Sequence, residues 1–269
     1  MIGMLKSEIY KLFTRRSFYV CGIILLALVA INVWTTEAQF CLQYGIEGGL
    51  DLKKFGFTGW DGIMRGLSLL STWGIVISSI FSSTFVCSEF SSGMVKNFAV
   101  RGKNKFIMYF SKLIACLFVP IIYTLLSVLV SYAIGAFLWS PGEWKDAYVN
   151  SLLIPFGFFV LIQVVFQSIF VMVGYIIESS GWSSGINFGL AIRLLPDLII
   201  AGIGFVLQNW FGLKNIYVGK YWLGSFFDIY TNRWPFENEI MSILPWLLLA
   251  YLVIPSLIGS IVFSRREVK

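Results

Sequence analysis

The sequence contains no histidine, and its four cysteines have none of the spacings typical of metal ligands. The lack of histidine excludes the usual zinc sites and any hydrolase built on a serine–histidine pair. Of Cys21, Cys41, Cys87 and Cys116, only Cys41 is expected on the outer side of a membrane, so no intramolecular disulfide is predicted. The sequence therefore predicts neither a metal site nor a catalytic residue in this chain.

Charged side chains are also scarce. They make up 13% of the chain, against about 25% in soluble domains, whereas hydrophobic residues make up 58%. A soluble helical bundle is disfavoured because too few polar residues remain to cover its surface. The net charge of +6 is compatible with nucleic-acid binding, but the basic residues do not form one patch, so we predict no nucleic-acid partner.

A nucleotide-binding signature is absent from the sequence. A P-loop requires Gly-x-x-x-x-Gly-Lys-Ser/Thr, in which backbone amides surround the phosphates. The nearest match, Gly219-Lys220, is followed by Tyr221 and lacks the upstream glycine. The chain is therefore not expected to hydrolyse ATP itself. An intramembrane protease is disfavoured as well, since the apolar runs contain no paired carboxylates.

Long apolar runs fill most of the chain instead. A helix of about 20 apolar residues crosses a bilayer core, and hydrocarbon cannot hydrogen-bond an exposed backbone. We predict an all-α membrane protein with one domain over residues 1–269. Its six spans lie at about 17–36, 66–88, 110–138, 149–177, 183–207 and 240–264. The excess of Lys and Arg on one side places both termini in the cytoplasm.

Two segments outside the spans have helical apolar periodicity. Over residues 2–16, one face is apolar and the opposite face carries Ser7, Lys11 and Arg15, which predicts a helix on the membrane surface. An ordinary charged flank of the first span is the alternative. A second amphipathic helix is predicted from Glu89 to Phe98, on the inner face, with side chains free to meet a soluble partner.

The outer connections are rich in aromatic residues. The first outer loop covers about 37–61. The last, about 208–239, is long, and its aromatic density predicts a re-entrant segment at the outer headgroup level before the last span. An ordinary aromatic belt is the alternative.

Few polar groups lie inside the spans. Gln163 and Gln167 are one turn apart in the fourth span, and Arg193 and Asp197 are spaced i, i+4 in the fifth, with Pro196 between them. Intramembrane charge is costly and marks function by default, so these four residues are candidates for a substrate path. The alternatives are that the glutamines join helices, that Arg193 and Asp197 neutralise each other at a subunit interface, or that Arg193 lies at the inner boundary.

Small polar residues recur at steps of three and four in the second span, from Ser68 to Thr84. Such a face favours close helix packing, and a hydrated path is the alternative.

Three features together resemble the ABC-2 type permease family. The segment MLKSEIYKLFTRRSFYV, residues 4–20, resembles that family's amphipathic "elbow" helix. Glu89 and Gly93, followed by Lys96, Arg101 and Lys112, resemble its Glu-x-x-x-Gly-Thr coupling stretch, although Met94 replaces the threonine. The third feature is the layout of six spans with an outer re-entrant segment. The elbow sequence also resembles permeases for export of, or immunity to, bacteriocins, lantibiotics and phenol-soluble-modulin-type peptides.

The resemblance implies the permease subunit of an ATP-driven exporter in the bacterial plasma membrane. It implies a separate ATPase subunit that holds ATP and Mg²⁺, a second permease chain, identical or related, and an amphipathic peptide substrate. Contact with the ATPase is then expected at the coupling residues Glu89, Phe90, Gly93, Met94, Lys96, Phe98 and Arg101. An ion-driven secondary transporter and a non-transporting immunity protein are the alternative functions.

The resemblance also leads to an expectation for Glu89. Its replacement by lysine should leave assembly nearly intact and uncouple ATP hydrolysis from transport.

Overall fold

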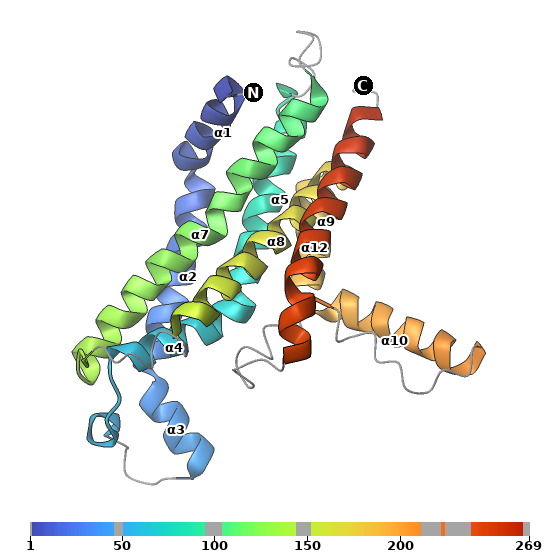
Figure 1. The fold of residues 1–269 in the computed structure, drawn as a ribbon. Helices are drawn as coiled ribbons and strands as arrows, with labels where there is room; N and C mark the ends of the chain where they lie inside the picture. Colours follow the sequence, from blue (N-terminus) through green and yellow to red (C-terminus); the bar gives the residue numbers. More distant parts are fainter. Residues whose placement is uncertain are drawn as a thin grey trace.

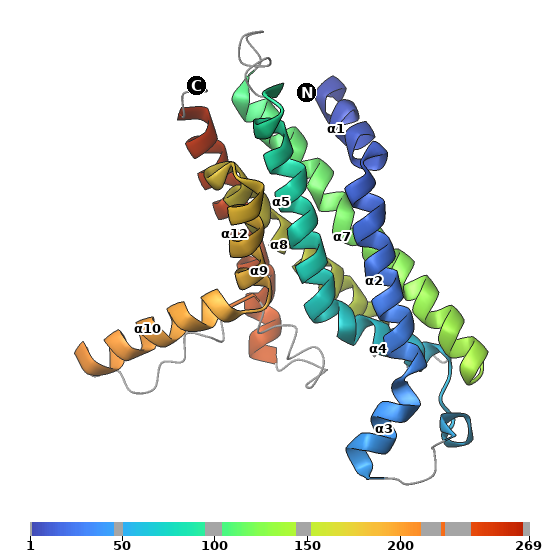
Figure 2. The same ribbon diagram turned by 180° about the vertical axis from the view of Figure 1, so that it is seen from behind.

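The computed structural model describes residues 2–45, 51–94, 104–143, 152–210, 222–223 and 238–265. Throughout these residues the regular structure is helical, with no strand, which confirms the predicted all-α class. The long helices lie alongside one another in an elongated bundle (Figures 1 and 2). Helices satisfy their own backbone hydrogen bonds, as a hydrocarbon environment requires.

The helices follow the apolar runs of the sequence and are joined by shorter helical pieces. Their bounds are α1 (Ile2–Thr14), α2 (Arg16–Trp34), α3 (Thr36–Tyr44), α4 (Gly59–Leu69), α5 (Ile75–Ser91), α7 (Lys105–Leu138), α8 (Ile154–Ile177), α9 (Ser180–Ala191), α10 (Leu194–Trp210) and α12 (Asn238–Arg265). A 3₁₀ turn, η1, covers Leu52–Phe55, and a π-helical segment, η2, covers Leu70–Gly74.

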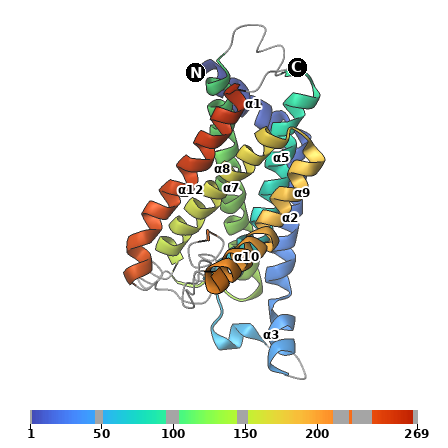
Figure 3. The same cartoon turned by 90° about the vertical axis from the view of Figure 1, so that its right-hand side faces the viewer.

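Within the described residues, five helical segments are long and apolar enough to cross a membrane. They are Arg16–Trp34, Gly59–Ser91, Lys105–Leu138, Phe156–Ile177 and Ile243–Arg265. The start of α1 and the end of α12 lie at the same end of the bundle (Figures 1 and 3), as an even number of spans requires. The assignment of that end to the cytoplasm remains a prediction from the distribution of Lys and Arg.

The predicted fifth span is not one straight helix. It consists of α9 and α10, which pass the length and composition test together but are bent by 65° at the break between them. Arg193 lies in the break with a φ of 69°, in the left-handed region. Pro196 lies in the first turn of α10, where a missing N–H costs nothing because that amide has no partner within a helix. Pro196 therefore fits the first turn of a second helix, which starts at Leu194 and points away from the bundle (Figure 1).

The second span begins earlier than its predicted start at residue 66. Its helix starts at Gly59, where the backbone N–H of Thr58 donates to Asp61 Oδ2 at 2.8 Å. This reciprocal cap fixes a helix start within residues that were predicted to be loop. The chain changes direction at η2, so α4 runs at an angle to α5 (Figures 1 and 2).

Two glycines on α4 and one on α7 allow the close contact between these helices. A Cβ added at Gly62 would lie 2.7 Å from the carbonyl oxygen of Ser131, and one added at Gly66 would lie 2.7 Å from the Ser131 Cβ. One added at Gly135 would lie 3.1 Å from the Gly62 Cα. Small residues at a helix contact bring the backbones together and increase dispersion contacts in lipid, where the hydrophobic effect between helices is absent.

Candidate functional site

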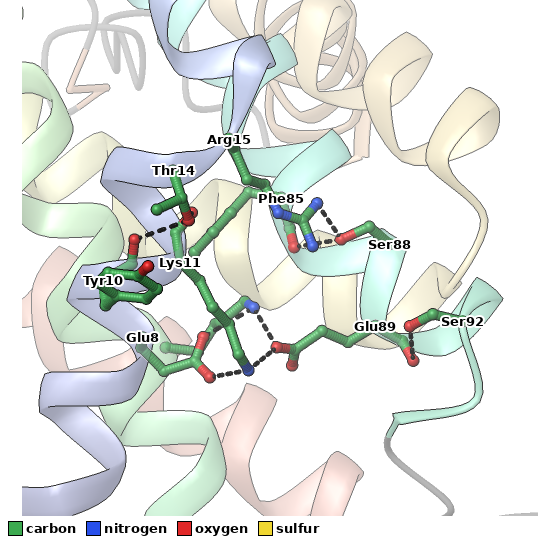
Figure 4. A network of polar contacts seen from close by, with 10 residues as sticks. Glu8, Tyr10, Lys11, Thr14, Arg15, Phe85, Ser88, Glu89 and Ser92 are labelled. Atoms are coloured by element: carbon green, nitrogen blue, oxygen red, sulfur yellow. Dashed lines mark hydrogen bonds and ion pairs between the residues drawn. The ribbon is translucent and has the colours of Figure 1, made fainter.

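Four charged side chains from three helices meet inside the bundle, near the end that is predicted to be cytoplasmic. Glu8 and Lys11 come from α1, Glu89 from the last turns of α5 and Lys112 from α7. Lys11 Nζ lies 2.6 Å from Glu8 Oε1 and 2.9 Å from Glu89 Oε1, and Lys112 Nζ lies 2.9 Å from Glu8 Oε2 and 2.7 Å from Glu89 Oε1. We call these residues the four-charge cluster. Figure 4 shows Glu8, Lys11 and Glu89 converging from their helices.

Three members of the four-charge cluster are buried, the Lys11 side chain is 20% exposed, and the cluster is neutral overall. Lys112 is 0% exposed, Glu89 5% and Glu8 7%. Burying an ion costs several kcal/mol, and only close partners of opposite charge offset that cost. Here each carboxylate contacts both ammonium groups, so no charge is left uncompensated. Removal of any one member would leave a buried net charge.

Aromatic and basic neighbours continue the contact between α1 and α5. Lys112 Nζ lies 4.0 Å and the Arg15 guanidinium 5.2 Å from the centroid of the Phe85 ring. Arg15 Nη1 also donates to Ser88 Oγ at 2.5 Å. A cation over an aromatic face is stabilised by the ring quadrupole, by about 2 kcal/mol when desolvated. The side of α1 that carries Glu8 and Lys11 therefore faces the bundle, together with Arg15 just after the helix.

Two opposing effects act on the pKa of Lys11. Burial lowers it, but the hydrogen bonds and negative charges of Glu8 and Glu89 outweigh burial, so the pKa lies above its ordinary value of 10.5. Lys11 thus stays protonated throughout the physiological pH range.

The predicted amphipathic helix from Glu89 to Phe98 is not continuous. Glu89 and Phe90 belong to the end of α5, and Gly93 has a φ of 68°, a conformation that favours glycine and ends the helix. Glu89 is inside the four-charge cluster rather than free to meet a soluble partner. The structure does not support the expectation that Glu89→Lys would leave assembly intact, because a third ammonium would join those of Lys11 and the fully buried Lys112.

The other predicted coupling residues differ in their surroundings. Phe90 packs edge-on against the rings of Tyr175 and Phe263, with centroids 5.6 and 6.1 Å away. Met94 is 41% exposed. Lys96, Phe98 and Arg101 lie outside the described residues, as does most of the predicted outer re-entrant segment.

Gln163 and Gln167 are buried and connect helices. Gln163 Nε2 donates to the carbonyl oxygen of Leu70 at 3.2 Å, and its Oε1 accepts from Thr124 Oγ1 at 3.1 Å. Gln163 thus bonds a carbonyl of η2, where the π-helical turn interrupts the regular hydrogen-bond pattern. Gln167 Oε1 accepts from Ser82 Oγ. The interpretation that these glutamines join helices fits these contacts better than exposure to an open path.

The serine-rich face of α5 packs against α8 and α9. Ser79, Ser82 and Ser83 are 0% exposed. Asn187 Nδ2 on α9 donates to Ser83 Oγ at 2.8 Å and to the carbonyl oxygen of Phe170 at 3.1 Å. These contacts support close packing, rather than a hydrated path, for this face in the present conformation.

The structure does not place Arg193 and Asp197 on one continuous helix. Arg193 lies in the break before α10, whereas Asp197 lies in the first turn of α10, with its backbone N–H donating to the Arg193 carbonyl at 2.9 Å. The role of these two residues in a substrate path or at a subunit interface stays a prediction.

All four members of the four-charge cluster lie in the two segments that carry the family resemblance, but nothing in their spacing indicates that they meet. Glu8 and Lys11 lie in the segment that resembles the elbow helix, and Glu89 and Lys112 lie in the stretch that resembles the coupling element. A lysine preceding an unbroken apolar run was the available signal. Its partners lie 104 and 23 positions away in the chain, and their proximity is decided by helix packing.

No curated protein matches the chain. The family model described as ABC-2 family transporter protein matches residues 4–195, which is more than half of the sequence. The match includes α1, the four-charge cluster and the helices from α2 to α9. The chain therefore belongs to the ABC-2 transporter family and is a multi-pass membrane permease of an ABC transporter.

Proposed function

We propose that this permease exports amphipathic peptides, driven by an ATPase subunit that acts on the segment between α5 and α7. The family membership supports association with such a subunit and with the bilayer. ATP and Mg²⁺ bind at the ATPase subunit, and this chain binds no cofactor of its own. A second permease chain, identical or related, completes the path.

The observation that carries the proposal is the position of the four-charge cluster. Glu89 lies just before the segment between α5 and α7, and Lys112 lies in the second turn of the helix that follows it. Their ion pair therefore joins the two helices that flank the segment, and Glu8 and Lys11 extend the connection to α1. Separating buried opposite charges is costly. A displacement of the segment is thus transmitted to α1, α5 and α7 as a unit.

ATP drives transport by shifting a conformational equilibrium. Nucleotide can do so only through a higher affinity for one of two states. ATP binding favours the closed ATPase subunits, and the α5–α7 segment, with Met94, Lys96, Phe98 and Arg101, transfers that preference to the spans. The buried glutamine and serine contacts between α5, α7 and α8 are those that would rearrange when a path opens.

The peptide class rests on the resemblance of residues 4–20 to peptide export and immunity permeases and on the apolar, weakly polar character of the spans. An amphipathic peptide would enter sideways from the inner leaflet. Localisation to the bacterial plasma membrane rests on the same resemblance.

Purification from native membranes, followed by reconstitution in liposomes, tests the function. We expect an ATPase to co-purify and an amphipathic peptide such as nisin to stimulate ATP hydrolysis and to be transported. Transport without ATP but with an ion gradient would identify a secondary transporter. Peptide binding without transport would identify an immunity protein. Either result overturns the proposal.

The double variant Glu89→Gln/Lys112→Met tests the coupling role. It removes one charge of each sign, so the cluster stays neutral while the ion pair between α5 and α7 is lost. We expect the complex to assemble and the peptide transported per ATP to fall severalfold. The matched control Asp51→Asn/Lys54→Met removes an exposed pair whose charged atoms are 3.5 Å apart. An unchanged transport-to-ATP ratio in the double variant would remove the coupling role.

A further inference from the structure

An apolar pocket lies between α1 and α7, next to the four-charge cluster. Its volume is about 170 Å³, and each helix contributes three lining residues, all apolar: Ile9, Leu12, Phe13, Ala115, Phe118 and Ile122. We call this the α1–α7 pocket. Leu12 follows Lys11 of the cluster directly, and Ala115 lies one helical turn after Lys112.

The α1–α7 pocket has a buried floor and an exposed rim. Leu12 is 1% exposed and Ala115 0%, whereas Phe13 is 43% exposed and Phe118 45%. The pocket is therefore open to the surroundings of the protein. For a span of a membrane permease, the surroundings of α7 at this depth are acyl chains.

The character of the lining decides between a peptide and a lipid chain. A peptide backbone carries N–H and C=O groups that need partners, and burying one without a hydrogen bond costs several kcal/mol. The pocket offers no side-chain donor or acceptor among its lining residues. A hydrocarbon chain has no such requirement, so it is the better match.

Charges on α1 indicate the headgroup. Residues 2–16 contain a single acidic side chain, Glu8, which is buried and already paired with two lysines. Lys6 and Arg16, near the two ends of α1, are exposed. The exposed charges on α1 and at the start of α2 are therefore positive. Basic residues at a cytoplasmic membrane surface attract anionic lipid, with an effect of about fivefold in affinity for each Lys or Arg.

We propose that the α1–α7 pocket binds one acyl chain of an anionic phospholipid from the adjacent leaflet, with the headgroup near Lys6 and Arg16. The bound lipid fills space between α1 and α7 beside the four-charge cluster. This inference depends on the membrane location of the chain and is independent of what the permease transports.

Native mass spectrometry after reconstitution tests the proposal. The vesicles contain phosphatidylglycerol and phosphatidylcholine in equal amounts, and the lipid retained by the extracted protein is counted. We expect the unmodified protein to retain phosphatidylglycerol preferentially. Ile122→Trp fills the pocket and should abolish most of this retention. The matched control Leu126→Trp places the same side chain one turn further along α7, where the residue is 41% exposed and outside the pocket, and should retain lipid normally.

The headgroup is tested separately from the acyl chain. Lys6→Gln and Arg16→Gln should each lower the preference for phosphatidylglycerol about fivefold, whereas Lys54→Gln, an exposed charge after α3, should not. If Ile122→Trp does not fold, Ile9→Trp fills the pocket from the α1 side. Equal retention of the two lipids by the unmodified protein, or equal lipid in the filled and control variants, would overturn the proposal. The proposal would also be overturned if Ile122→Trp lowered the amount of peptide retained by the protein but left the amount of retained lipid unchanged.

Discussion

Replacing Lys112 by methionine removes one positive charge from the four-charge cluster while largely conserving side-chain volume. Two carboxylates then share the single ammonium of Lys11, which leaves one buried negative charge. Lys112 is fully buried and contacts both Glu8 and Glu89. Breaking a buried ion pair from one side costs about 3–5 kcal/mol, so we expect a strong destabilisation.

Restoring neutrality should recover much of that loss. In Glu89→Gln/Lys112→Met the remaining Glu8 and Lys11 still compensate each other across 2.6 Å. Neutral replacement of a buried pair is often nearly without cost. We therefore expect the double variant to be more stable than Lys112→Met alone, a non-additivity that simple loss of packing would not produce.

Buried thiols provide the assay. Cys87 and Cys116 are free and buried, so a thiol-reactive fluorophore labels them as the protein unfolds on heating. At roughly 2–4 °C per kcal/mol, Lys112→Met should lower the unfolding midpoint by about 10 °C. The control Lys54→Met removes an exposed pair and should shift it by less than about 2 °C. An unchanged midpoint for Lys112→Met, or no recovery in the double variant, would refute the electrostatic reasoning.

Three further predictions use the same thermal assay. Gly62→Ala places a Cβ 2.7 Å from a backbone oxygen of α7 and should destabilise by about 1–3 kcal/mol, whereas Gly202→Ala meets nothing within 4 Å and should be neutral or stabilising; equal effects would contradict the packing argument. Gln163→Leu leaves the Leu70 carbonyl of η2 without its side-chain donor and should cost about 1 kcal/mol, so a loss as large as that of Lys112→Met would be unexpected. Because the pKa of Lys11 is raised in the folded protein, its contribution to stability is complete below its ordinary value of 10.5 and is lost as pH rises through the higher folded value. The contribution of Lys11 to stability should therefore change little between pH 6 and 9 and fall above about pH 10.5. In Lys11→Met this loss of stability at alkaline pH should disappear.

The break between α9 and α10 illustrates what hydropathy leaves undecided. The run from Ser183 to Leu207 is long and apolar enough for a span, and Pro196 within it is expected to weaken the helix locally. Whether a proline kinks a helix or begins a new one depends on which carbonyls its neighbours can satisfy. In this chain the left-handed conformation of Arg193 ends α9, and α10 leaves the bundle.

The start of α4 is a helical segment that the sequence pattern did not predict. Gly59 falls within the outer loop predicted over about 37–61, and Gly62 falls before the predicted start of the second span at residue 66. Their spacing places them on one helix face, but glycine at a helix contact is favourable only when another backbone approaches it. Ser131 and Gly135 of α7 supply that approach, and they lie too far away in the chain for local periodicity to reveal it.

The amino-acid sequence alone determined that the chain is helical and lies in a membrane, because apolar length and scarcity of charge depend on composition and local order. It also supplied the family resemblance and the individual polar candidates. Only the tertiary structure placed Glu89 inside the four-charge cluster and paired it with Lys11 and Lys112. Helix formation depends on neighbouring residues, whereas ion pairing depends on which helix faces meet, and that is decided by packing across the whole bundle.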